Sequence, residues 1–108
     1  MSTLSDILKL FNWGPSHKTQ PSPTVIKLNF RDVCVLDKVD DIYAGIKELS
    51  LNHNQLVSLD GIEQFRCLEV LSLNFNRLGS RAELLKLTSP HLLRELNVRG
   101  NPGLDSPS

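Results

Sequence analysis

Residues 46–65 read IKELSLNHNQLVSLDGIEQF, and this stretch decides the fold. Its apolar residues first recur two apart, at Leu49 and Leu51, which is the spacing of one face of a β-strand. After Asn54 they recur three apart, beginning at Leu56, which is the spacing of a tight helical or 3₁₀ return. A strand, a turn at an asparagine and a helical return together make one coil of a solenoid.

The same pattern recurs along the rest of the chain. One copy lies 22 residues downstream, another lies 25 residues beyond it, and a weaker copy lies 21 residues upstream, with Val33 in place of the asparagine. The motif LxxLxLxxN is the signature of leucine-rich repeats; it predicts an α/β solenoid with parallel strands on the concave face and helical or 3₁₀ returns on the convex face. The matched sets are Ile46, Leu49, Leu51, Asn54 and Leu56; Leu68, Leu71, Leu73, Asn76 and Leu78; Leu93, Leu96, Val98 and Asn101; and Val25, Leu28, Phe30 and Val35.

A short amphipathic helix is predicted over residues 3–12. Its apolar residues follow helical spacing, and Thr3 and Asp6 are placed to cap its first turn. The end coil of a solenoid exposes an apolar cross-section unless something covers it, so we expect this helix to cover the first coil. The alternative is a helix that docks on a partner. The apolar residues of the helix are Leu4, Ile7, Leu8 and Phe11, and those it would cover are Val25, Leu28 and Phe30.

These elements divide the chain into three parts. Residues 1–24 hold the capping helix and a proline-rich linker, residues 25–104 form a leucine-rich-repeat domain of three to four repeats, and residues 105–108 are a polar tail. The third return is longer than the second, with a helical segment over residues 82–87 that Ser80 can cap. No cap is recognisable after the last strand. We therefore expect that the chain is a fragment of a longer protein, or that another chain, such as a second copy, covers this end.

The repeats resemble those of a known family. Their 22-residue spacing is similar to the short leucine-rich repeats of the protein-phosphatase-1-regulator type, and within that class the chain most resembles the axonemal dynein light chain family. In that family a short helix, a linker with Thr and Pro and an IKL strand precede the repeats, in the same order as residues 4–11, 18–22 and 26–28 here. Residues 82–87 and 100–102 resemble its last repeats. The resemblance implies a protein-interaction role in cytoskeletal, ciliary or centrosomal assembly.

Composition and charge exclude several classes of function. The 108 residues carry twelve basic and twelve acidic side chains, and this zero net charge argues against a dedicated binder of nucleic acid or anionic membrane. No apolar run approaches the roughly 18 residues of a membrane span, and the first residues lack the features of a signal peptide. The expected location is the cytoplasm, including cytoskeleton, cilium or centrosome, with the nucleus as the alternative. Cys34 and Cys67 form no motif and are expected to be buried or half-buried free thiols.

The candidate partner-binding surface consists of the side chains that alternate with the buried leucines along the strands. Polar groups of both charge signs surround one apolar anchor, formed by Val70 and Phe75. An exposed aromatic residue ringed by hydrogen-bonding groups is typical of a protein interface; the alternative is a polar face that only keeps the solenoid soluble. The predicted columns are Lys27, Glu48, Val70 and Glu95; Asn29, Ser50, Ser72 and Asn97; and Arg31, Asn52, Asn74 and Arg99, flanked by Asp32, His53 and Phe75.

No residue pattern points to catalysis, a cofactor, a metal or a small-molecule ligand. The chain has no glycine-rich phosphate loop and no catalytic-serine or zinc-protease motif, and His17, His53 and His91 lack metal-ligand spacing. Asn54 and Asn76 are assigned to the fold, because buried backbone groups need such amides. We expect a non-enzymatic interaction module. The alternatives are an RNA-processing or export-associated repeat domain, in which Arg31, Arg99 and Phe75 would stack on bases, or a dimerisation domain.

Overall fold

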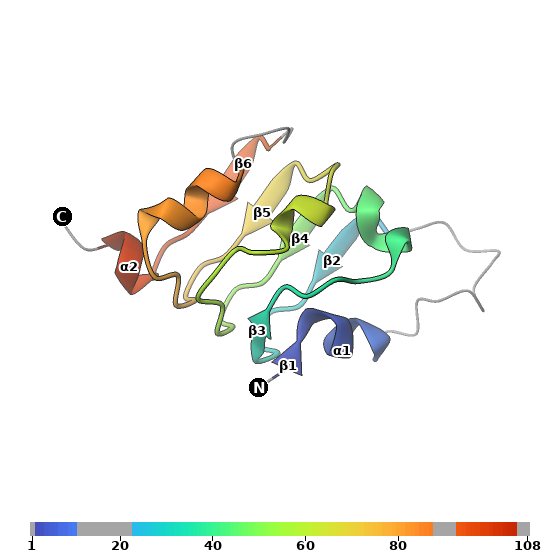
Figure 1. Cartoon of the computed structure of the whole chain (residues 1–108), viewed down its shortest axis with the longest axis horizontal. Coiled ribbons are helices and arrows are strands. Elements are labelled where there is room, and N and C mark those ends of the chain that lie inside the picture. The colour runs from blue at the N-terminus through green and yellow to red at the C-terminus, as the bar shows by residue number, and fades with distance from the viewer. Residues whose placement is uncertain (1, 11–22, 88–92, 106–108) are drawn as a thin grey trace.

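The computed structural model describes residues 2–10, 23–87 and 93–105. Most of the predicted linker (up to residue 22), Phe11 of the helix, His17, His91 and the last three residues of the tail lie outside these ranges. The chain forms an α/β fold with parallel strands in two sheets (Figure 1). Its elements are β1 (Ser2–Thr3), α1 (Leu4–Lys9), β2 (Val25–Lys27), β3 (Val33–Val35), η2 (Asp41–Gly45), β4 (Glu48–Ser50), η3 (Ile62–Gln64), β5 (Val70–Ser72), η4 (Arg81–Leu87), β6 (Glu95–Asn97) and α2 (Pro102–Asp105).

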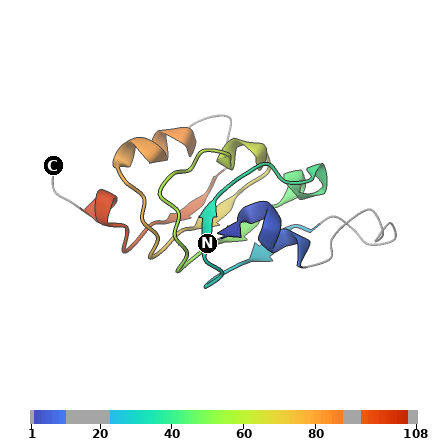
Figure 2. The same ribbon diagram turned by 60° about the horizontal axis from the view of Figure 1, so that its bottom comes forward.

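The larger sheet has the strand order β2-β4-β5-β6, and all neighbours are parallel. Leu49 lies opposite Leu71, and Leu71 lies opposite Leu96, so the strands pair at the offsets of 22 and 25 residues that the sequence repeats. The predicted register of these three strands is confirmed. The 3₁₀ helices η3 and η4 lie on the other side of the molecule from the strands (Figure 2). No helix in the described ranges is both long enough and apolar enough to cross a membrane.

The core lies between the strands and the returns. Leu49 and Leu71 point into it from the strands, and Leu59, Ile62 and Phe65 point into it from the second return. All five side chains are fully buried or nearly so. Burial of each contributes roughly 1.5–3 kcal/mol before entropy is subtracted. The change of spacing from two to three along residues 46–65 therefore has the predicted cause.

Buried asparagines tie each strand-and-return unit to the one before it. Asn76 Nδ2 donates to the carbonyl oxygen of Leu51 at 2.8 Å, and Asn76 Oδ1 accepts from the backbone N–H of Leu56 at 3.1 Å. Asn54 bonds the preceding unit in the same way, and so does Asn101. These amides satisfy buried backbone groups at the bend after each strand. The structural assignment of Asn54 and Asn76 is confirmed.

The first unit is in a different register from the one predicted. Ile26 lies opposite Leu49, so the offset is 23 residues rather than 21. Val33 is fully buried, whereas Val25 and Phe30 are exposed. The prediction failed because apolar residues fit both alignments, and Val33 was assigned to the asparagine position. Hydrogen bonding decides between the alignments, since Asn54 Oδ1 accepts from the backbone N–H groups of Arg31 and Val33 at 3.0 and 2.9 Å.

The helix α1 packs beside β3 at the N-terminal end of the molecule (Figure 1). Thr3 caps it as predicted, because Thr3 Oγ1 accepts from the backbone N–H of Asp6 at 3.2 Å. Its side chains Leu4, Ile7 and Leu8 are buried in the common core. The helix covers this end of the sheet, as predicted. It does not cover Val25 and Phe30, which were expected to lie beneath it only because the first unit was placed in the wrong register. It is held there by parallel pairing of β1 with β3 and by hydrogen bonds from Ser5 to Asp37.

The C-terminal end is less well covered. The return η4 is helical over the predicted segment, and Leu87 is buried. The edge strand β6 follows, and its residues Leu96 and Val98 are only partly buried, unlike their counterparts in β5. Leu93 and Leu104 are also only partly buried.

Candidate functional site

The strands present one face away from the core, called here the strand face. The observed register arranges its side chains in three columns, which run across the strands. Three sequence-predicted residues change place. Lys27 belongs to the serine column rather than beside Glu48, and Asn29 belongs with Asn52 rather than with the serines. Arg31 leaves the face for the position of the buried asparagines. The columns are Val25, Glu48, Val70 and Glu95; Lys27, Ser50, Ser72 and Asn97; and Asn29, Asn52, Asn74 and Arg99.

The third column is a ladder of side-chain amides. Asn29 Oδ1 accepts from the backbone N–H of Asn52, Asn52 Oδ1 accepts from that of Asn74, and Asn74 Oδ1 accepts from that of Arg99, each at 2.8 Å. The hydroxyls of Ser50 and Ser72 donate to the first two of these oxygens. Asn52 and Asn74 were predicted to bind a partner, and their oxygens are engaged within the fold. The amide nitrogen of Asn74 has no hydrogen bond among the described residues.

A column of stacked rings follows the amide ladder, and we call it the aromatic ladder: Phe30, His53 and Phe75. The ring centroids of Phe30 and His53 are 4.3 Å apart with planes at 9°, and those of His53 and Phe75 are 4.6 Å apart with planes at 17°. All three side chains are exposed, Phe75 at 47% and Phe30 at 73%. The exposure predicted for Phe75 is confirmed, and that of His53 with it.

Each ring of the ladder sits on strained backbone. The φ angles of Phe30, His53 and Phe75 are 60°, 58° and 61°, in the left-handed region where bulky residues are outliers. Gly100 takes the next equivalent position with φ 74°, and a Cβ built on it would lie 2.4 Å from Phe75 Cδ1. The ladder therefore ends at Phe75, whose ring lies against Gly100.

The prediction that Val70 and Phe75 form one apolar anchor is wrong. Val70 lies in the first column between Glu48 and Glu95, at the start of the strand. Phe75 lies beyond the strand's end, on the order of 10–15 Å away at the rise of an extended chain. Phe30 was missed because the shifted alignment gave it to the core. The sequence did hold a signal for the three aligned rings. Residues 30, 53 and 75 are spaced by 23 and 22 residues, and each directly precedes the position that Asn54 and Asn76 hold in their units.

A groove of about 410 Å³ runs beside the aromatic ladder. Besides the three rings, its lining includes Gln55, Arg77 and Pro102. Asp32 is close by, but its carboxylate accepts a hydrogen bond from Gln55 Nε2 at 2.9 Å. Among the described residues that line the groove there is one guanidinium group and no carboxylate.

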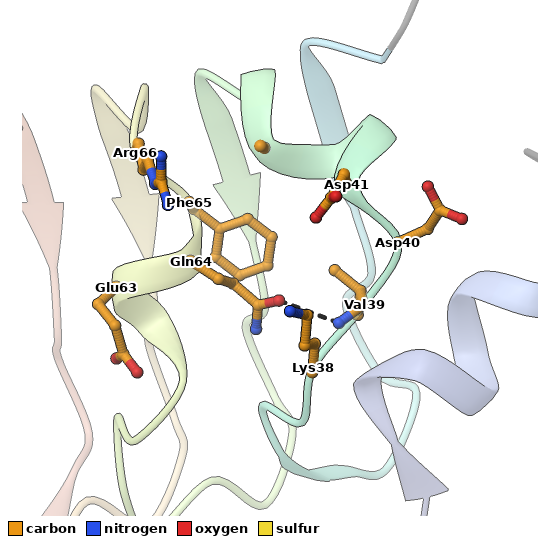
Figure 3. Close-up of a pocket in the computed structure, with 9 residues that line it drawn as sticks. Lys38, Val39, Asp40, Asp41, Glu63, Gln64, Phe65 and Arg66 are labelled. Carbon is orange, nitrogen blue, oxygen red and sulfur yellow. Dashed lines mark hydrogen bonds between the residues drawn. The ribbon is translucent and has the colours of Figure 1, made fainter.

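A second pocket of about 340 Å³ lies between the returns η2 and η3 (Figure 3). Charged side chains of both signs line it, including Lys38, Asp41 and Arg66. Gln64 crosses it to accept from the backbone N–H of Val39 at 3.0 Å, and its amide nitrogen donates to the backbone carbonyl oxygen of Asp37. No group of three or more potential metal ligands occurs in the described part of the chain. The side chain of Gln64 therefore links the return that contains η3 to the segment that precedes η2.

A charged cluster links the later returns η3 and η4. Lys86 Nζ lies 2.6 Å from both Asp60 Oδ1 and Glu83 Oε1. Its hydrogen bonds to Asp60 and Glu83 raise the pKa of the lysine, and its bond to Glu83 lowers the pKa of that carboxyl. Glu83 Oε1 also accepts from the backbone N–H of Leu59 at 2.8 Å. This cluster is far from the strand face along each unit and joins one return to the next.

Comparison with known proteins gives two partial relatives. The mouse (Mus musculus) centrosomal protein of 72 kDa is 40% identical over 58 residues, which are 54% of this chain and 9% of the relative. The chicken (Gallus gallus) serine/threonine-protein kinase 11-interacting protein is 39% identical over 54 residues, which are 50% of this chain and 5% of the relative. The chain thus spans a small part of the relatives it matches. No protein-family model matches the sequence, and no solved structure matches it significantly.

Proposed function

We propose that this chain is a leucine-rich-repeat solenoid that acts as a non-enzymatic module and binds a protein partner on its strand face. The observation that carries the proposal is the repeated unit itself. The units that begin at β4 and β5 each contribute a short parallel strand, a buried asparagine and a 3₁₀ return, and the outward columns are left free of any covering element among the described residues. Such repeats stack into an extended surface, which is the usual binding surface of repeat proteins.

The composition of the strand face supports a protein as the partner. Glu48 and Glu95 lie at one end of the strands, the amide ladder lies in the middle, and exposed rings lie at the other end. Interfaces combine aromatic anchors with a polar surround that fixes orientation. The face offers both.

We further propose that the partner belongs to cytoskeletal, ciliary or centrosomal assembly. One partial relative is named as a centrosomal protein and the other as a protein that interacts with a kinase, and both names fit an interaction role. The matched segments are short parts of both relatives.

Site-specific photo-crosslinking in ciliated cells tests the proposal. A photo-reactive amino acid replaces Val70 on the strand face in one variant and Arg66 on the returns in another. We expect the first variant to give discrete crosslinked species containing centrosomal or ciliary proteins, and the second to give none. Equal crosslinking from both positions, or crosslinks only to unrelated proteins, would contradict the proposal.

A further inference from the structure

The aromatic ladder exposes ring edges more than ring faces. Both faces of the His53 ring are covered, one by Phe30 and one by Phe75. The Cδ1–Cε1 side of the Phe75 ring lies against Gly100. The edge of an aromatic ring carries partial positive charge and its face partial negative charge. The exposed part of the ladder at His53 and Phe75 therefore favours carboxylates and the faces of other aromatic rings.

Two arginines give this end of the molecule the same preference. Arg77 lines the groove, and Arg99 ends the amide ladder in the unit that contributes Gly100. Both side chains are exposed, and neither guanidinium group has an ion pair within the ranges that the structure describes. Asp32 lies near the groove and is hydrogen-bonded to Gln55, and the acidic end of the strand face, at Glu48 and Glu95, is several residues away along the strands. Guanidinium groups pair with carboxylates through charge-assisted hydrogen bonds.

The turn that follows each strand does not by itself explain why aromatic residues occupy these positions. Left-handed backbone costs a bulky residue on the order of 1–2 kcal/mol, and Gly or Asn avoids most of that cost. Ring stacking returns about 0.5–1.5 kcal/mol per pair. Stacking thus offsets the strain at best, while the Phe30 and Phe75 side chains remain substantially exposed.

We propose that the groove along Phe30, His53 and Phe75, with Arg77 and Arg99, binds a linear acidic segment of a partner protein that carries an aromatic side chain. The aromatic side chain packs its face on the ring edges, and neighbouring carboxylates pair with the two guanidinium groups. This inference rests on the proposed function, since it names the chemistry of the partner at one end of the strand face.

The same geometry disfavours two other occupants. Single-stranded RNA is bound by stacking of bases on exposed aromatic faces, whereas both faces of His53 and the inner faces of Phe30 and Phe75 are taken up by stacking within the ladder. A basic segment would bring like charge to Arg77 and Arg99. Both occupants are arms of the experiment below.

The test is binding of fluorescent probe peptides to the full chain, followed by fluorescence anisotropy and by NMR shifts of the labelled chain. The first probe alternates Glu with Phe, the second replaces every Glu by Lys, and the third replaces every Phe by Ala; a uridine oligonucleotide is the fourth. We expect only the first to bind with shifts centred on residues 30, 53, 75, 77 and 99, with the second and third at least about tenfold weaker.

Variants separate the ladder from the fold. Phe75→Asn removes the ring while keeping a residue that suits left-handed backbone, and we expect it to weaken the first probe about fivefold. Arg77→Glu should weaken it about tenfold. Val57→Ala and Arg66→Glu are matched controls elsewhere on the surface and should leave binding unchanged. All variants should keep the dispersed NMR spectrum of a folded chain.

The outcomes distinguish this inference from the proposed function. Equal binding of the lysine peptide, tighter binding of the oligonucleotide, or binding unaffected by Phe75→Asn would overturn the acidic-segment site. Centrosomal crosslinks at Val70 could still be observed in that case, and the proposed function would stand. Probe binding at the ladder without such crosslinks would support the site and remove the cellular assignment.

Discussion

At the scale of single residues, the aromatic ladder sets backbone strain against ring stacking. Phe75 has φ 61°, and Gly100 holds the equivalent position at φ 74° without a side chain. Phe75→Gly loses one stacked pair and relieves the strained backbone, two terms of about 1 kcal/mol each and of opposite sign. We expect the free energy of unfolding, measured by urea titration, to change by less than about 1 kcal/mol. Phe65→Ala, in the core, should cost about 3–5 kcal/mol in the same titration.

Unlike Phe75, Asn76 is expected to be essential for the stability of the fold. Its amide bonds the backbone of Leu51, Leu56 and Leu73, and its side chain is almost fully buried. Asn76→Ala leaves these backbone groups without partners, and we expect a loss of about 2–4 kcal/mol of unfolding free energy. Asn97→Ala is the matched control, because within the described part of the chain that amide bonds only Glu95, at an exposed site. A loss for Asn76→Ala no larger than the control's would contradict the structural role.

At the scale of elements, the Asp37 carboxylate contributes to the docking of α1, beside the pairing of β1 with β3 and the buried helix side chains. Burial acts to raise the pKa of Asp37, but hydrogen bonds from Ser5, Thr3 and the backbone of Asp37 together outweigh it, so the pKa lies below the ordinary value of 3.8. A depressed pKa in the folded state contributes stability above the unfolded pKa, and that contribution is lost as the pH falls through the folded pKa. Acid should therefore loosen the contact between α1 and β3.

Urea titrations at pH 6 and at pH 3 check this expectation. We expect the wild-type chain to lose more stability between the two pH values than Asp37→Asn, which keeps an acceptor but does not titrate. The difference should be less than about 1 kcal/mol, since solvent screens a partly exposed carboxylate. An equal loss in both chains would assign the acid sensitivity to other carboxylates.

At the scale of the whole molecule, the sequence predicts most of the sheet and less of the surface. Leu49, Leu71 and Leu96 recur with little ambiguity because the buried asparagines mark the register independently of the leucines. The first unit has Arg31 at the position of the buried asparagine, so apolar residues alone could not separate the 21-residue from the 23-residue offset. That two-residue shift removed Phe30 from the expected surface and placed Arg31 on it. The stacking of rings depends on φ angles and spatial neighbours, which a linear pattern does not contain.

The two ends of the sheet differ in how well they are covered, and this difference is measurable. Leu71 in β5 is fully buried, whereas its counterpart Leu96 in β6 is only partly buried. Leu71→Ala should lower the free energy of unfolding by about 2–5 kcal/mol, and Leu96→Ala by less than about half of that. Leu96 is less buried to begin with, so its truncation removes less buried area and leaves no closed cavity. Urea titrations of both variants at two protein concentrations give the comparison. Equal costs, with midpoints that rise with concentration, would mean that a second copy covers β6 in solution and that the uncovered edge is a dimer interface.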